Sequence, residues 1–412
     1  MRTLIIGGGA AGCFAAVQAA AAGEEVVLLE RNDRLGKKLR ITGKGRCNVT
    51  NDCDRDTLMQ NIPHGGRFLY SAFAACSPQD VMAYFEGLGI PLKVERGNRV
   101  FPVSDRASDI ADALANEMRR LHVELIHDRV TALLTDPEGR CCGAACGKKE
   151  YAADRVILAA GGATYPGTGS EGDGYKLAAS VGHTVTALRP SLVPLETLER
   201  DCAEMMGLSL KNVTLSLRRN GKNVFSEQGE MLFTHFGVSG PLVLSASAHI
   251  EGEGTWTLHI DMKPALTPEQ LDKRIQREIT EAPNKALPSL LRKVVPASMV
   301  MPLIGRCGIP AQTRCNSLTK PQRTRICTVL KNFDFTVRGT RPMAEGIITR
   351  GGVLCKEVDP KTMQSKLVPG LYFAGEVLDC DAYTGGFNLQ IAWSTAYLAA
   401  RASHQSQGAL PQ

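Results

Sequence analysis

The sequence predicts an α/β fold in which a parallel-sheet domain is split by an inserted domain of antiparallel strands and helices. Two patterns carry this prediction. Short apolar runs that end in glycine recur near both ends of the chain and are typical of buried parallel strands. In the middle of the chain, apolar and polar residues alternate, which is typical of antiparallel strands. The length of 412 residues also exceeds the roughly 250–300 residues that one hydrophobic core serves.

The first thirty residues predict a β-α-β unit. Residues 3–6 form a short β-prone run, residues 10–22 are mostly alanine, and residues 26–30 form a second apolar run. Alanine has the highest helix propensity, and Gly23 ends the expected helix. Because β-α-β crossovers join parallel strands with a right-handed connection, a parallel sheet follows.

Similar patterns assign the rest of the chain. Helices are expected at 77–87, 107–121 and 388–400, and strands at 123–126, 130–134, 155–160 and 370–376. Antiparallel pairing is predicted in the middle of the chain. The evidence is the alternation at 213–217, a type I′ turn at Asn220-Gly221 and a strand pattern at 255–260. A capping box at Thr267 opens a helical stretch expected to continue through 290–295. The predicted domains are 1–192 with 338–412, and an insert at 193–337.

Composition and charge exclude several classes of protein. The 48 Lys and Arg exceed the 42 Asp and Glu by 6, and this charge is expected to be spread along the chain. Nucleic-acid-binding proteins more typically show a basic stripe interleaved with aromatics, so we expect a small-molecule substrate and no nucleic-acid partner. No run approaches the ~18 apolar residues of a membrane helix, and Gly7-Gly8-Gly9 ends the first apolar run too early for a signal peptide. A cytoplasmic protein without a membrane partner is expected.

The 13 cysteines do not predict a disulfide framework, because their number is odd and no secretory signal precedes them. No pair has C-x-x-C spacing and the eight His are scattered, so no metal site is expected. Cys141 and Cys146 have the spacing of the redox pair in flavin disulfide reductases, and Cys47 and Cys53 are an alternative pair with one residue too many. Reduced, structural cysteines are the expected state.

A glycine motif between the first strand and the first helix predicts a dinucleotide site. Gly7, Gly9 and Gly12 fit G-x-G-x-x-G: the first permits the turn, the second lets backbone approach a pyrophosphate, and the third allows close packing. The pyrophosphate then lies at the positive end of the helix dipole. Glu30 follows Gly12 by 18 residues, at the end of the second strand, where it can bind ribose hydroxyls.

Further glycine-rich segments favour FAD, bound non-covalently since no flavin-linking His motif is present. A long basic loop at 35–48 can run along an extended cofactor, with Lys38 near phosphate or ribose and Asn48 at a ring edge. Strands that end in glycine at 158–162 and 373–376, and a helix that opens at 385–390, are expected at the same sheet edge. The predicted cofactor-binding residues are Gly7, Gly9, Ala11, Gly12, Glu30, Arg31, Lys38, Leu39, Asn48, Val130, Gly161, Gly162, Asp173, Gly375, Glu376, Gly386, Asn388 and Leu389.

These segments resemble the bacterial YhiN-like flavoproteins that include the bile-acid-inducible BaiN type, within the two-dinucleotide-fold flavoprotein group. The matching segments are 6–12, 43–51, 101–104, 172–175, 237–241 and 371–393, and Lys44 stands where members have Gly. The resemblance implies a Rossmann-like FAD domain, split around an insert with a β-barrel-like part and helices. It also implies oxidoreductase activity.

The primary expectation is an FAD-dependent NAD(P)H oxidoreductase that transfers hydride from flavin N5 to an electron-poor double bond, such as that of a conjugated 3-oxo bile acid. Two alternatives stay open. One is a flavin amine oxidase of the aminoacetone oxidase type, reoxidised by oxygen. The other is a flavin-bearing RNA-modification or RNA-binding protein. No second G-x-G-x-x-G segment predicts a separate NAD(P)H module.

The residues that would polarise the carbonyl group and supply a proton are harder to predict. Tyr165 and Tyr383 follow cofactor-contacting strands, and Arg341 lies near the end of the insert, which makes them candidates. For each of them, a packed Tyr hydroxyl or a cofactor-positioning Arg is the simpler explanation.

Overall fold

The computed structural model describes residues 1–405, which fold as two compact units. One unit combines Met1–Ser191 with the chain from Pro342 onward, and the other is Leu192–Arg341. The sequence placed the insert at 193–337. Among the helices of residues 1–405, none combines the length and the apolar character needed to cross a bilayer.

The first unit is built on a five-stranded sheet in which every pair is parallel. Its strand order is β19 (Leu371–Phe373), β10 (Arg155–Leu158), β1 (Arg2–Ile6), β2 (Glu25–Glu30) and β6 (Glu124–His127). β1 pairs with β2 on one side and with β10 on the other, so the strand order reverses there. In open α/β sheets, ligands bind outside the carboxyl ends of the strands at such a point.

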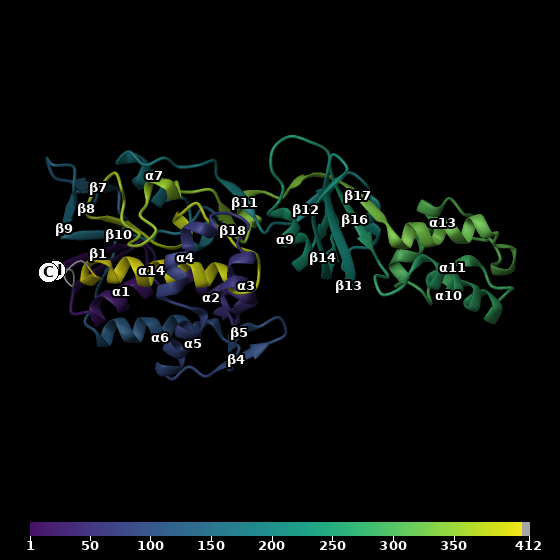
Figure 1. Cartoon of the computed structure of the whole chain (residues 1–412), viewed down its shortest axis with the longest axis horizontal. Helices are drawn as coiled ribbons and strands as arrows, with labels where there is room; N and C mark the ends of the chain where they lie inside the picture. Colours follow the sequence, from purple (N-terminus) through teal and green to yellow (C-terminus); the bar gives the residue numbers. More distant parts are fainter. Residues whose placement is uncertain (406–412) are drawn as a thin grey trace. The chain divides into compact units, whose positions relative to one another are not determined.

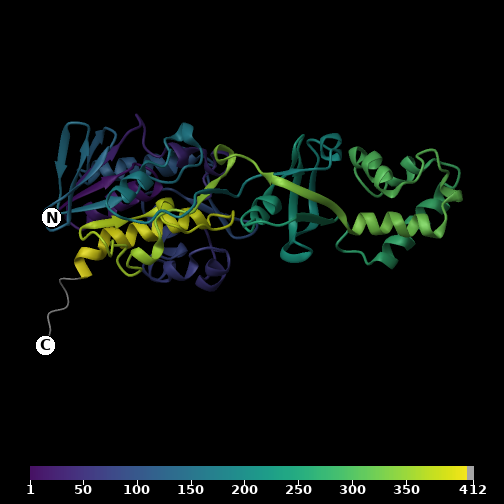
Figure 2. The same cartoon turned by 90° about the horizontal axis from the view of Figure 1, so that it is seen from above.

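Two helices pack together beside this sheet, and Figure 1 shows them side by side: α1 (Ala10–Ala21) and α14 (Phe387–Gln405). Gly12 permits the close fit of α1, because a Cβ there would overlap the carbonyl oxygen of Gly7. The fully buried Trp393 of α14 packs on Phe14 and Phe85, with ring centroids 5.4 and 5.5 Å away. Figure 2 shows α14 in yellow along the length of this unit.

Smaller elements complete the first unit. The helices are α2 (Lys37–Gly45), α3 (Arg55–Gln60), α4 (Tyr70–Ala75), α5 (Pro78–Gly87), α6 (Ala107–Arg120) and α7 (Asp173–Ser180). The strands are β3 (Thr50–Asn51), β4 (Leu92–Glu95), β5 (Arg99–Pro102), β7 (Ala132–Thr135), β8 (Cys141–Cys146), β9 (Lys149–Ala152), β11 (Arg189–Ser191) and β18 (Ile348–Arg350). β7, β8 and β9 form a separate antiparallel sheet, so the strand expected at 130–134 does not belong to the parallel sheet.

The expected basic loop at 35–48 is partly a helix. Gly36, in a left-handed conformation, precedes α2, whose Leu39 is buried, and the helical geometry breaks at Thr42, Gly43 and Lys44. The glycines that predicted a loop therefore lie at the start and the break of this helix.

The structure rules out Cys141 and Cys146 as a redox pair. They lie at opposite ends of β8, and at ~3.3 Å per residue their Cα atoms are about 16 Å apart, beyond the ~7 Å limit for a disulfide. Burial raises the pKa of each thiol to about 11, which keeps both protonated at neutral pH. All 13 cysteines are free.

The second unit contains a closed antiparallel barrel, as the resemblance implied. Its strands follow one another in the order β12 (Leu195–Thr197), β15 (Gly237–Ser239), β14 (Lys222–Phe233), β13 (Ser209–Arg219), β16 (Trp256–Asp261) and β17 (Phe333–Thr340). Asn220 and Gly221 connect β13 to β14 with φ of 47° and 79°, the two left-handed residues that a type I′ turn requires. The short helices α8 (Asp201–Glu204) and α9 (Pro241–Ser247) accompany the barrel.

Four helices lie between β16 and β17 and share a hydrophobic core with the barrel. They are α10 (Pro268–Glu281), α11 (Leu287–Leu291), α12 (Val300–Cys307) and α13 (Lys320–Lys331). The expected capping box is confirmed: Thr267 accepts from the Gln270 amide, and Gln270 accepts from that of Thr267. The prediction that this helical stretch continues through 290–295 is wrong. α10 ends at Glu281, before Pro283, because a proline disfavours helical geometry in the residue before it.

A buried ion pair ties the first and last parts of the first unit together. The Arg155 guanidinium contacts Glu24 at 2.7 Å and donates to Thr3 and to the carbonyl groups of Ala399 and Ala400 in α14. Arg155 is 2% exposed. A buried charge left without its partner is strongly destabilising.

We predict that Arg155→Met lowers the free energy of unfolding of the first unit by about 3–5 kcal/mol. The chain has two Trp residues, so denaturation of a Trp256→Phe background followed by Trp393 fluorescence reports on this unit alone. Arg96→Met, at an exposed site, should change the free energy by less than about 0.5 kcal/mol. Equal effects of the two substitutions would contradict the structural role of Arg155.

Candidate functional site

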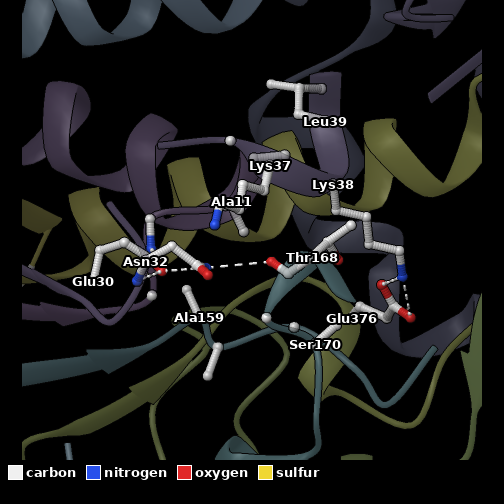
Figure 3. Close-up of a pocket in the computed structure, with 18 of the residues that line it drawn as sticks. Ala11, Glu30, Asn32, Lys37, Lys38, Leu39, Ala159, Thr168, Ser170 and Glu376 are labelled. Atoms are coloured by element: carbon white, nitrogen blue, oxygen red, sulfur yellow. Dashed lines mark hydrogen bonds and ion pairs between the residues drawn. The ribbon is translucent and has the colours of Figure 1, made fainter. Parts of the chain in front are cut away.

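A pocket lies in the first unit, at the carboxyl ends of β1, β2 and β10 (Figure 3). Its walls come from the β1–α1 turn, the end of β2, α2, the loop after β10, β18 and the start of α14. Segments from residue 6 to residue 392 therefore meet around one cavity. This is the position that the reversal of strand order predicts for a ligand.

One wall is the turn before α1. Gly9 is the N-cap residue of α1 and has no side-chain cap, so the first amide groups of the helix remain available. A Cβ at Gly9 would meet no protein atom within 4 Å, and Gly9 lines the pocket. Exposed amide groups and the positive end of a helix dipole form a phosphate-binding site.

A second wall is formed by Glu30, which ends β2. Its carboxylate accepts from the backbone amide of Gly8 at 2.6 Å, and from the backbone and side-chain amide groups of Asn32 at 2.7 and 2.6 Å. Asn32 also donates to the carbonyl oxygen of Thr168, as Figure 3 shows. These bonds hold the carboxylate in place beside the pocket, where its other lone pairs can accept from ribose hydroxyl groups.

Next to Glu30, the pocket is bordered by an ion cluster. Arg31 contacts Asp173 at 2.8 Å and Glu171 at 2.9 Å, and Arg129 contacts Asp173 at 2.7 Å. The hydrogen bond from Arg31 lowers the pKa of Glu171. The cluster joins the loop after β2 to the start of α7 and so fixes the width of this end of the pocket.

Lys38 and Glu376 form an ion pair within the lining, at 2.8 Å (Figure 3). Lys38 also contacts the hydroxyl oxygen of Thr164 at 2.8 Å, and Glu376 accepts from the backbone amide of Thr349 at 2.9 Å. The pair presents a cation and a carboxylate to the same cavity, a donor and an acceptor for a polyhydroxyl or phosphate chain.

At the start of α14, residues 48–51 pack against the helix. Thr50 donates to Gln390 at 2.6 Å, Trp393 donates to the carbonyl oxygen of Val49 at 2.9 Å, and a Cβ at Gly386 would overlap the backbone of Thr50. The buried Oδ1 of Asn48 has no hydrogen-bond partner among residues 1–405. A buried acceptor without a partner is unusual, and Asn48 itself does not belong to the described lining of the pocket.

The structure also brings together three residues that sequence reasoning missed. Asp381 is buried and its two carboxylate oxygens contact His64 Nδ1 at 3.0 Å and the Ser191 hydroxyl at 2.8 Å. Ser191 pairs in register with Ile348, which lines the pocket. Asp381 can therefore orient the His64 ring, although none of the three residues belongs to the described lining of the pocket. His64 and Asp381 are 317 positions apart, and no local pattern signals their contact.

The sequence profile described as "HI0933-like protein Rossmann domain" matches residues 1–402. The chain belongs to the HI0933-like family. It is 33% identical to the 3-dehydro-bile acid delta(4,6)-reductase of Clostridium scindens, over 98% of each chain. It is also 31% identical to the ribosomal RNA dihydrouridine synthase of Haemophilus influenzae, over 97% of each. The resemblance to BaiN-type proteins is confirmed, and the protein is an FAD-dependent oxidoreductase.

A solved structure shares the fold of this HI0933-like chain. It is the 3-ketosteroid delta1-dehydrogenase of Sterolibacterium denitrificans, with a TM-score of 0.51, 14% identity and 99% coverage of both chains. At this identity the comparison supports the architecture alone.

Of the eighteen residues predicted to bind the cofactor, thirteen line the pocket: Gly7, Gly9, Ala11, Glu30, Arg31, Lys38, Leu39, Val130, Gly161, Asp173, Glu376, Asn388 and Leu389. The other five do not line it: Gly12, Asn48, Gly162, Gly375 and Gly386. Several of the glycines among these five are needed because neighbouring atoms leave no room for a side chain. A Cβ at Gly162, for example, would overlap the carboxylate of Glu376. Sequence reasoning missed further lining residues, among them Asn32, Lys37, Thr168, Ser170 and Ile348.

None of the three proposed catalytic candidates belongs to the described lining of the pocket. Tyr165 is 37% exposed, in a left-handed turn with φ of 53°. Tyr383 is partly buried against the core of the first unit. Arg341 belongs to the second unit, where it pairs with Glu196 at 2.8 Å and stacks on the ring of Phe236 at 4.5 Å.

The residues present fit FAD. The open space at Gly9, the uncapped start of α1 and the carboxylate of Glu30 suit the diphosphate and ribose of a dinucleotide. The start of α14, with Asn388 and Leu389 in the lining, suits the flavin end of the cofactor. These observations concern separate parts of the same cofactor.

We predict that Gly9→Val yields folded, colourless protein. A Cβ there would meet no protein atom within 4 Å, so we expect the fold to tolerate Val, whose side chain would occupy the space next to the α1 amide groups. Flavin absorbance per protein and circular dichroism measure the two properties separately. Gly87→Val, also in open space on exposed helix surface, should keep its FAD. Stoichiometric FAD in the Gly9→Val protein would refute this site.

Proposed function

We propose that this FAD-dependent oxidoreductase reduces a carbon–carbon double bond conjugated to a carbonyl group, with NAD(P)H as the electron donor. The observation that carries the proposal is the chemistry shared by the named relatives. A delta(4,6)-reductase of a 3-dehydro-bile acid and a synthase of dihydrouridine each add two hydrogens to such a bond. One bond lies in a steroid and the other in a uracil ring.

The balanced reaction adds one hydride and one proton across the double bond while NAD(P)H becomes NAD(P)⁺. When bound, FAD would supply the two-electron hydride chemistry that links the nicotinamide to the carbon β to the carbonyl. The chain has no second dinucleotide motif, so we propose that NAD(P)H binds transiently. Two substrate classes agree with this chemistry: a conjugated 3-oxo steroid and a uracil within RNA.

The chain's own residues would hold the cofactor, stabilise negative charge on it and supply the proton. The start of α14 places the positive end of a helix dipole at the pocket, where it stabilises negative charge on a reduced cofactor. Lys38 and Glu376 orient hydroxyl and phosphate groups through their paired charges. His64, oriented by Asp381, is our candidate for the group that protonates the carbon next to the carbonyl.

The proposed function is tested by anaerobic mixing of the yellow protein with NADH, NADPH or an amine. We expect NADH or NADPH to bleach the flavin, and a 3-oxo-Δ4 steroid or a uridine-containing RNA to restore its colour. Mass spectrometry should then find two added hydrogens in the product. Bleaching by an amine alone would instead indicate an amine oxidase, and a flavin that no donor bleaches would rule out the proposal.

We predict that His64→Gln slows reoxidation of the reduced flavin by the double bond roughly 10²-fold or more, because the proton donor is lost. Bleaching by NAD(P)H, which needs no such proton, should keep its rate. Asp381→Asn should slow the same step and shift its pH profile, since Asp381 acts through His64. His122→Gln, at an exposed position, is the control. Equal loss in both half-reactions would show that His64 has only a structural role.

A further inference from the structure

The segment between β16 and β17, residues 262–332, carries a strong excess of positive charge. It contains 13 Lys and Arg against 4 Asp and Glu, a net charge of +9. The rest of the chain contains 35 Lys and Arg against 38 Asp and Glu, a net charge of −3. The overall charge of +6 is therefore concentrated here rather than spread along the chain. We call residues 262–332, with α10 to α13, the basic helical segment.

Part of this charge has an ordinary structural explanation. Asp272 pairs with Arg323 at 3.1 Å, and Glu278 and Glu281 both pair with Lys293 at 2.8 Å. These pairs account for three of the four acidic residues in the segment and are typical of a solvated helix surface. They need no ligand.

A larger set of basic residues has no such explanation. Seven exposed basic side chains of the segment have no ion-pair partner within residues 1–405: Lys273, Arg277, Lys285, Arg292, Arg314, Lys320 and Arg325. Exposed charges of one sign on one small region raise the local potential and attract ions of the opposite sign.

Some of these charges lie together along α10. Lys273, Arg274 and Arg277 line an open groove there, together with Gln270, Gln276 and Thr280, and one acid, Glu281. Residues three and four positions apart share one face of a helix, so the cations lie in a row. Burial and the charge of Arg274 lower the pKa of the neighbouring Lys263. A bound anion would relieve this repulsion between like charges.

The composition of the segment narrows the kind of anion. Its 71 residues contain no Phe, Trp, Tyr or His. Helices that lie on membranes usually present Trp, Phe or Leu on an apolar face, and proteins that bind single strands stack bases on aromatic rings. Lys, Arg, Gln and Thr side chains instead suit the phosphates and sugars of a folded nucleic acid.

We propose that the basic helical segment binds the phosphodiester backbone of a folded RNA. This inference rests on the proposed function. Of the two substrate classes named there, only the uracil is part of a polyanion. A steroid needs no such surface. Binding through phosphates makes the affinity depend strongly on salt and weakly on base sequence.

The test measures binding of a fluorescein-labelled RNA hairpin of about 40 nucleotides to the oxidised holoenzyme by fluorescence anisotropy at several salt concentrations. We expect the double variant Lys273→Glu/Arg277→Glu to bind about tenfold or more weakly, with a log–log salt slope smaller by roughly 2. The matched control Arg96→Glu/Lys148→Glu changes the net charge equally at exposed sites of the first unit and should bind like the unaltered protein.

The outcomes separate this inference from the proposed function. RNA binding is measured without NAD(P)H, whereas bleaching of the flavin by NAD(P)H should be the same in both double variants. Equal RNA binding by the two variants, or binding of anionic phospholipid vesicles with no binding of RNA, would overturn the inference and leave the reductase proposal standing. Loss of RNA binding in the α10 variant alone, with circular dichroism unchanged, supports it.

Discussion

The carboxylate of Glu376 is the interaction on which the candidate site depends. It contacts Lys38 at 2.8 Å and accepts from the backbone amide of Thr349 at 2.9 Å, so it joins α2 and β18 to the segment that follows β19. Lys38 and Glu376 are 338 positions apart. They meet because β19 adds to the sheet beside β10, parallel to it, which brings its carboxyl end to the edge formed by β1 and β2. The pocket therefore requires both ends of the chain.

Much of this architecture could be predicted, because it rests on local constraints. Gly7, Gly9 and Gly12 each answer a steric requirement of one strand–turn–helix unit, and Glu30 has its place at the end of the next strand. The type I′ turn at Asn220-Gly221 and the capping box at Thr267 are equally local, and the structure contains both. Such features are determined by residues a few positions apart and do not depend on contacts with distant parts of the chain.

What could not be predicted depends on contacts between distant segments. The chain Ser191–Asp381–His64 joins three separate loops and strands, and none of them has a motif of its own. The boundaries of single helices were also hard to predict. Glycine and proline indicate that a helix ends nearby without fixing the residue, as the break of α2 at Thr42–Lys44 and the end of α10 at Glu281 show. The concentration of charge in residues 262–332 was visible in the sequence but required the boundaries of β16 and β17 to be recognised as one segment.

The proposed reduction of conjugated double bonds depends on the FAD pocket of the first unit and on His64 held by Asp381, and the basic helical segment of the second unit would bind an RNA that carries the double bond. It requires above all that a single FAD connects the glycine turn before α1 with the start of α14. A crystal structure of the yellow protein tests this claim most directly. We expect the diphosphate at Gly9, the ribose at Glu30 and the flavin ring beside Asn388 and Ile348. A flavin bound outside this pocket, or a dinucleotide with its flavin ring away from α14, would contradict it.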